Sequence, residues 1–323
     1  MGTDKPLISI LMAVYEPNLD WLREQLLSLN NQTYGNLRLY IRDDCSPTVP
    51  FQQIQSCVQD CISAFPVTLV RNEQNLGSNG TFERLTQEAE GDFFAYCDQD
   101  DVWLPEKLDT LYHTIQQEKA LLVCSDTFII DGQGQLTATS ITQVRRHHIF
   151  YTGDDLVSRL LFSNFVIGCT MLVDAHAAKE AIPFCPHYVH DQYLAIWCAS
   201  HGKVVALSTP LIQYRIHSAN QTLEMAGVTN RDTYYKFRIE IVLLRLQWMK
   251  EHFPCDPSLR ETVESALIWA KARCRNWKHR GGAFTMLRLS RFNRPISLFE
   301  VVGAWLPSPA VMWFVDLKRK NKV

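Results

Sequence analysis

The chain has 323 residues, of which 46% are hydrophobic, and its formal net charge is −2. This length and composition exclude a disordered protein and suffice for one large globular domain with an appended region. Because no run of about 18 apolar residues occurs, the sequence predicts no membrane-spanning helix.

The charge is distributed unevenly along the chain. Residues 271–323 contain twelve Lys and Arg against two acids, Glu300 and Asp316, which gives +10, and the rest of the chain carries −12. This split indicates a basic surface element attached to an acidic body. An anionic membrane or a nucleic acid is the candidate partner of such an element.

Cysteine spacing and the N-terminal residues bear on the compartment. The ten cysteines include no CxxC pair, so we expect reduced thiols rather than disulfides or a zinc site. The first residues, MGTDKPLISILMAVYE, contain neither a basic region nor a small-residue cleavage site, so no signal peptide is expected. These features favour a cytoplasmic protein.

The first hundred residues alternate between strands and helices. Strands are predicted at residues 7–14, 37–41, 67–70 and 93–97, and helices at residues 18–30 and 81–90. Such alternation predicts an α/β fold with a doubly wound, mostly parallel sheet.

The rest of the chain continues this pattern and then becomes helical. We predict a strand at residues 121–124, a hairpin at IIDGQGQLT, a helix that starts near Asp191 and a strand that ends in YRIHSANQT. Helical periodicity over residues 233–252 and 258–277 predicts a helical C-terminal region. The expected domains are residues 1–225, with parts 1–101 and 102–225, and residues 226–323.

Polar side chains follow each of the first four predicted strands, where ligands bind in doubly wound sheets. They are Tyr15 and Glu16, Asp43 and Asp44, Arg71 and Asn75, and finally Asp98, Asp100 and Asp101. The last three carboxylates raise one another's pKa unless a cation lies between them. The alternative is a solvated turn in which Asp101 caps the next helix. Four successive polar strand ends favour a ligand site over that alternative.

These motifs resemble family 2 glycosyltransferases with the GT-A fold, and within them the bacterial rhamnosyltransferase-like branch. The resemblance covers roughly residues 7–222. It rests on ISILMAVYEP, IRDDCS, RNEQNLGSNGTFERL, YCDQDDVWLPEKL, GCTMLV, HDQYLAIW and YRIHSANQT, which occur in the family's order. The resemblance implies that residues 1–101 bind a nucleotide sugar and that residues 102–225 bind the acceptor.

The resemblance also implies roles for the residues that bind the donor. Asp44 or its neighbour Asp43 would bind the nucleotide base in a pocket lined by Ala13, Tyr15 and Glu16. Arg71 and the loop that contains Asn75 and Gly77 would approach base and phosphates. Asp98 would contact the ribose, and Asp100 would bind the Mg²⁺ or Mn²⁺ that bridges the phosphates. Carboxylate oxygens are the ligands that these ions prefer.

The remaining motifs imply the reacting groups. Asp191 would be the catalytic base, with His190 in place of the acid often found before it; the alternative for Asp191 is a helix N-cap. Gly168, followed by Cys169, would let the backbone approach a sugar, or would simply be part of a small pair in a buried strand. Arg215 would pair with phosphate oxygens. His217 would contact metal or phosphate, or serve a structural role.

Taken together, the resemblance implies a metal-dependent inverting transferase of cell-surface polysaccharide synthesis. The expected reaction moves rhamnose from dTDP-rhamnose to a lipid-linked glycan acceptor. Alternatives are another donor, such as UDP-glucose or UDP-galactose, and a non-catalytic nucleotide-sugar-binding module. A sugar-phosphate nucleotidyltransferase is disfavoured because AVYEPN, and not a Gly-rich basic loop, follows the first strand.

The C-terminal tail suggests where the enzyme works. Its apolar residues between Ile296 and Leu317, interrupted by Pro307 and Pro309, suit an interfacial segment on an anionic membrane. We therefore expect a peripheral protein at the cytoplasmic face of the cell membrane. The alternative is a helix packed on the body or in a homodimer interface. Nucleic acid is disfavoured because aromatic and charged residues are not interleaved.

Overall fold

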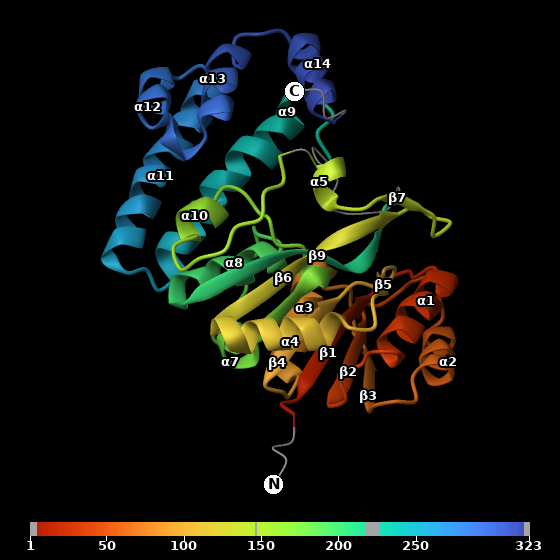
Figure 1. Cartoon of the computed structure of the whole chain (residues 1–323). Helices are drawn as coiled ribbons and strands as arrows, with labels where there is room; N and C mark the ends of the chain where they lie inside the picture. Colours follow the sequence, from red (N-terminus) through yellow and green to blue (C-terminus); the bar gives the residue numbers. More distant parts are fainter. Residues whose placement is uncertain (1–4, 146, 218–226, 320–323) are drawn as a thin grey trace. The chain divides into compact units, whose positions relative to one another are not determined.

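The computed structural model describes residues 5–145, 147–217 and 227–319 (Figure 1). The chain divides into two compact units, residues 1–218 and 219–323. The domain boundary expected at residue 225 lies outside the described residues, as do the last residues of YRIHSANQT.

The first unit is built on one sheet in the order β3-β2-β1-β4-β8-β6-β9-β5, with β7 paired to β6. Strands β1 to β4 are mutually parallel, β6 and β9 are also parallel, and β8, β5 and β7 pair antiparallel with their neighbours. The strands are β1 (Ile8–Val14), β2 (Leu37–Asp43), β3 (Val67–Arg71), β4 (Phe93–Cys97), β5 (Val102–Trp103), β6 (Ala120–Ile130), β7 (Leu136–Ala138), β8 (Met171–Asp174) and β9 (Lys203–Arg215).

Helices cover both faces of this sheet. Alternate residues of β1, including Ile8 and Met12, share a core with α1, α2 and α4, whereas α3 packs on the other face beside α7 and α8. The helices are α1 (Leu19–Asn30), α2 (Phe51–Cys61), α3 (Gly77–Glu88), α4 (Lys107–Glu118), α5 (Ile141–Val144), α6 (Val157–Leu160), η1 (Gly168–Thr170), α7 (Ala175–Glu180) and α8 (His190–His201). The predicted α/β fold is confirmed.

Local chemistry accounts for several element boundaries. Asn18 ends the turn after β1 and caps α1, because its side chain accepts hydrogen bonds from the amides of Asp20 and Trp21. Helix α3 begins at Gly77, earlier than the sequence pattern predicted, so part of the NLGSNG loop forms its first turn. All ten cysteines lie in the described ranges and are free thiols.

The second unit is helical. It contains α9 (Arg231–Tyr234), the π-helix η2 (Tyr235–Glu240), α10 (Ile241–His252), α11 (Pro257–Trp277), α12 (Ala283–Arg288), η3 (Ser290–Phe292), α13 (Arg294–Gly303) and α14 (Ser308–Arg319). Part of the tail packs on this unit, because Val311 and Val315 share a small core with Tyr234 and Trp277. Among the described residues, no helix combines the length and the hydropathy that crossing a membrane requires.

Candidate active site at the carboxyl ends of the strands

Strand register brings the predicted donor-binding residues of β1, β2 and β3 to one edge. Val14 lies beside Asp43, and Asp43 lies beside Arg71. The buried Asp43 carboxylate accepts from the Ser46 hydroxyl at 2.5 Å through Oδ1. Its Oδ2 has no hydrogen-bond partner among the described residues and lies 3.5 Å from Arg71 Nη1. A buried carboxylate oxygen left in this way is available to a ligand that brings a donor.

Asp44, the neighbouring candidate, is engaged by its own loop. It accepts hydrogen bonds from Asn72 Nδ2 at 2.8 Å and from the Leu76 amide at 2.7 Å. Within the same loop, the Gly77 amide donates to Asn75 Oδ1, and Gly77 has a φ of +72°, which favours glycine. Asp44 therefore shapes the start of α3, and the contacts favour Asp43 for the base.

Tyr15 and Glu16 follow β1 and serve different purposes. The Tyr15 side chain is exposed, while its amide and carbonyl are both bonded to the Gln99 side chain, at 2.8 and 3.1 Å. The Glu16 carboxylate accepts from the amide and hydroxyl of Thr48, and these bonds lower its pKa. Glu16 thus secures the loop after β2, and the Tyr15 ring is left free, next to half-buried Ala13, to line a pocket.

The carboxylates of the DQDD turn are largely buried. Burial, together with the nearby carboxylates of Asp100 and Asp191, raises the pKa of Asp98 to about 7. Asp101 is fully buried and accepts from the Arg215 amide at 2.9 Å. Helix α4 begins only at Lys107, so the reading of Asp101 as a helix cap is wrong. Concentrated, partly desolvated negative charge of this kind favours a cation.

Two groups of side chains could hold that cation. In the first group, ligand atoms of Asp98, Asp101 and Cys169 lie within 4.8 Å of one another. Burial raises the pKa of the Cys169 thiol, however, and a protonated thiol is a poor ligand.

Lys107 lies beside this first group. It donates to the Cys169 carbonyl at 2.6 Å, and its ammonium nitrogen lies 3.0 Å from the centroid of the Trp103 ring. Its own pKa is lowered to about 7 by burial.

Asp100 and His217 form the better group. Asp100 Oδ2 lies 2.7 Å from His217 Nε2, and the two side chains are 17% and 15% exposed. A carboxylate that reaches solvent at the end of a strand suits Mg²⁺ or Mn²⁺. The residues present therefore fit the implied ion, with Asp100 as the oxygen ligand and His217 beside it.

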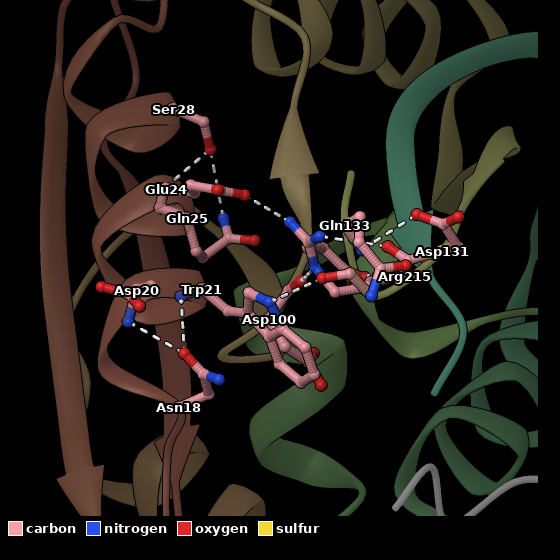
Figure 2. Close-up of polar contacts among 12 residues, drawn as sticks. Asn18, Asp20, Trp21, Glu24, Gln25, Ser28, Asp100, Asp131, Gln133 and Arg215 are labelled. Atoms are coloured by element: carbon pink, nitrogen blue, oxygen red, sulfur yellow. Dashed lines mark hydrogen bonds and ion pairs between the residues drawn. The ribbon is translucent and has the colours of Figure 1, made fainter. Parts of the chain in front are cut away.

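Arg215 is bound by groups of the protein itself. Its guanidinium is 1% exposed and donates to the Asp100 carbonyl at 2.8 Å and to the Asp131 carbonyl at 3.2 Å, besides pairing with the Glu24 carboxylate. Figure 2 shows Arg215 between helix α1 and the turn at Asp131, with Asp100 beside it. Arg215 therefore holds the turn that carries Asp100, and its pairing with phosphate oxygens stays a prediction.

Asp191 lies in the first turn of α8 with both carboxylate oxygens occupied. Oδ1 accepts from Asn164 Nδ2 at 3.1 Å and from the Gln192 amide at 2.5 Å, and Oδ2 accepts from the Gly168 amide at 3.1 Å. Val189 occupies the cap position, so Asp191 is not the helix N-cap. Burial raises its pKa to about 6, against these hydrogen bonds, which lower it. A carboxyl with such a pKa suits a general base.

His190 and Gly168 pack against each other beside Asp191. A Cβ at Gly168 would lie 2.8 Å from His190 Nε2, so any larger residue there would have to displace the His190 ring. The His190 ring lies 4.0 Å from the Phe82 ring between centroids, and burial lowers its pKa to about 3. Gly168 therefore serves close packing, with its amide turned toward Asp191.

Three residues of the site were missed by the sequence analysis: Glu24, Lys107 and Asn164. Each acts through a partner far away in the chain, and no local pattern marks such a contact. A recess of about 360 Å³ between α1 and α2, lined in part by Asp20, Arg23 and Asp60, contains none of the predicted site residues. The candidate chemistry does not lie there.

Comparison with known proteins identifies similar sequences and structures. The sequence profile of glycosyl transferase family 2 matches residues 9–180. An uncharacterized glycosyltransferase of Methanocaldococcus jannaschii is 28% identical over 77% of this chain and 82% of its own length. The UDP-Glc:alpha-D-GlcNAc-diphosphoundecaprenol beta-1,3-glucosyltransferase WfaP of Escherichia coli is 23% identical over 69% of this chain and 84% of its own.

A solved structure has the same fold. Residues 1–349 of S. aureus TarS, crystallised in complex with UDP-GlcNAc, superpose with a TM-score of 0.59 at 14% identity, over 98% of this chain and 90% of that chain. At this identity the similarity concerns the fold, and it agrees with the predicted GT-A architecture.

Proposed function

The chain belongs to glycosyl transferase family 2, and on that premise we propose that it is an inverting, metal-dependent glycosyltransferase of polysaccharide synthesis. The observation that carries the proposal is the convergence of Asp98, Asp100 and Asp191. Asp191 lies close enough to Asp98 for its charge to raise the pKa of that carboxyl. A base and a metal-binding carboxylate turn thus meet at one edge of the sheet.

The residues would act in the following way. Asp43, Arg71, the Tyr15 ring and the loop of Asn75 and Gly77 bind the nucleotide, and Asp98 contacts the ribose. Asp100, with His217 beside it, holds the Mg²⁺ or Mn²⁺, which when bound neutralises charge on the diphosphate leaving group. Asp191 removes the proton from the acceptor hydroxyl, whose oxygen attacks the anomeric carbon opposite the leaving group.

The names of related enzymes suggest a class of donor and acceptor. We propose a lipid-linked glycan acceptor at the cytoplasmic face of the membrane, in agreement with the name of the Escherichia coli relative. The same name supports UDP-glucose as the first donor to test, ahead of the dTDP-rhamnose implied by the sequence resemblance. A non-catalytic nucleotide-sugar-binding module is disfavoured because the buried Asp191 retains the environment of a base.

The test is a donor panel with the purified full-length protein and Mn²⁺. UDP-glucose, UDP-galactose, UDP-GlcNAc and dTDP-rhamnose are each incubated with and without a lipid diphosphate acceptor, and nucleoside diphosphate release is measured. The change Asp191→Asn should leave donor binding nearly intact and lower turnover by about 100-fold or more. Unchanged turnover in this variant would rule out Asp191 as the base, and donor binding without any release would favour a binding module.

A further inference from the structure

Helix α13 has an apolar stripe on its outer side. Leu298, Val302 and Trp305, which follows the helix, are 52%, 59% and 72% exposed. Their spacing of four and three residues places them on one face. Arg294 continues the same stripe at the start of the helix and is also exposed. Exposure of such an apolar surface to water is unfavourable, so surfaces of this kind usually mark a site that a membrane or another molecule covers.

Polar contacts on the inner side fix the orientation of α13. Trp269 Nε1 donates to Ser297 Oγ at 2.9 Å, and the buried Arg273 guanidinium pairs with the Glu300 carboxylate at 2.6 Å. Removing one partner of a buried ion pair is strongly unfavourable. The helix therefore cannot rotate to bury its apolar stripe against its own unit.

The neighbouring helices also expose apolar side chains. Helix α12 packs beside α13 and exposes Phe284, which is 79% accessible, and Leu287. Helix α14 is joined to α13 by the stacked rings of Phe299 and Phe314, with centroids 4.0 Å apart, and it exposes Trp313. We call the stripe of Leu298, Val302 and Trp305 on and directly after α13 the apolar face.

The charge around the apolar face is strongly positive. Between residues 271 and 294, seven exposed Lys and Arg side chains occur. Arg288 ends α12, Arg291 lies in the short helix η3, and Arg294 begins α13. The only acids of residues 271–323 in the sequence are Glu300, which is buried against Arg273, and Asp316. Exposed basic groups are therefore abundant in this unit, and one of them, Arg294, lies in the same helical stripe as Leu298 and Val302.

We propose that the apolar face docks on an anionic lipid surface, with its aromatic and aliphatic side chains in the headgroup boundary and the arginines on lipid phosphates. This combination of side chains is the one that interfacial helices use. A second copy of the chain fits less well, because a symmetric contact would bring like charges together. A nucleic acid is a poor partner for this face, because the aliphatic side chains of Leu298 and Val302 cannot stack on bases.

The inference adds a docking surface to the proposed location of the enzyme at a membrane. It rests on the proposed function only in that the acceptor is a lipid. Its test uses neither donor nor acceptor, so the two proposals can fail separately. The full-length protein is floated with vesicles of phosphatidylcholine alone or mixed with phosphatidylglycerol, at low and high salt. We expect binding to the mixed vesicles that weakens as salt rises, since headgroup attraction decays within about 8 Å at physiological ionic strength.

Two pairs of substitutions assign the binding to residues. Arg291→Gln with Arg294→Gln should weaken partitioning by about 25-fold, because each of the two basic side chains strengthens binding to an anionic surface about fivefold. Leu298→Ser with Trp305→Ser should weaken it at least about tenfold. The matched controls lie in the first unit: Lys119→Gln with Lys179→Gln, and Leu136→Ser with Ile149→Ser, whose side chains are all exposed. Neither control should change partitioning.

The outcomes against the proposal are distinct. Failure of the wild-type protein to float with mixed vesicles overturns it, and so does equal binding to phosphatidylcholine alone. Equal loss in the control pairs would show that general charge or apolarity, and not this face, is responsible. If sedimentation shows a dimer that Leu298→Ser with Trp305→Ser dissociates, the apolar face is an interface between copies of the chain.

Discussion

The environment of Asp191 predicts how the rate depends on pH. Its pKa of about 6, raised by burial from 3.8, means that about one-tenth of the carboxyl is ionised at pH 5 and about nine-tenths at pH 7. A base acts only when ionised, so kcat/KM should rise about tenfold between these pH values. At the ordinary pKa the group would already be ionised at pH 5, and the rate would be nearly flat.

A substitution at Asn164 should move this rise. In the wild type, the hydrogen bond from Asn164 to Asp191 Oδ1 lowers the pKa of the Asp191 carboxyl. Asn164→Ala removes this bond, so the pKa should rise. A hydrogen bond to a charged group contributes about 1.5 kcal/mol or more, and one pKa unit corresponds to about 1.4 kcal/mol. The midpoint should therefore rise by about one unit, to near pH 7, with the rate at high pH little changed.

Initial rates of nucleoside diphosphate release between pH 5 and pH 8.5 measure both effects. Asn164→Asp, which keeps the acceptor for the Val166 amide but puts a carboxylate beside Asp191, should shift the midpoint further. Ser163→Ala, at the exposed neighbouring position, should leave it unchanged. A flat profile for the wild type, or equal midpoints in the wild type and Asn164→Ala, would refute this account of the base.

Three further substitutions test other parts of the site. Asp100→Asn should weaken Mn²⁺-dependent donor binding at least about tenfold by calorimetry; unchanged binding that still responds to EDTA would place the metal elsewhere. Glu24→Gln removes a partner of Arg215 and should weaken Mn²⁺ binding about tenfold by electron paramagnetic resonance, whereas Glu118→Gln, which breaks only a pair with Lys203, should not. Gly168→Ala should lower the free energy of unfolding by about 1–3 kcal/mol, and less in the His190→Ala background; additive losses would contradict their contact.

Strand positions and their polar ends were accessible from the sequence, because they depend on short-range patterns. The apolar run at residues 93–97 is β4, with the predicted bounds, and three carboxylates follow it directly. Parallel pairing then requires that the residues after β1, β2 and β4 meet at one edge. Asp43, Asp98 and Asp100 could therefore be placed together without any knowledge of their contacts.

The partner of each side chain depended on residues far apart in the chain. The two-residue strand β5 pairs with β9 and brings Arg215 to Asp100 and Asp101, more than a hundred residues away. No local sequence pattern indicates that Arg215 is buried there among carbonyl and carboxylate groups of the protein. The same reason explains why no sequence pattern indicated Asn164, Lys107 or Glu24: each of them contacts the site from another element.

The sequence by itself determined the α/β fold, the order of its first strands, the edge where the acidic residues gather and the positive charge of the C-terminal region, because periodicity and composition are local properties. Tertiary structure decided which of those residues are free to bind a ligand. Asp44 and Glu16 are occupied by their own loops, whereas Asp43 keeps an oxygen without a hydrogen-bond partner among the described residues and Asp100 reaches solvent. Hydrogen bonding and desolvation distinguish chemically identical carboxylates, and both are set by neighbours that only the folded chain supplies.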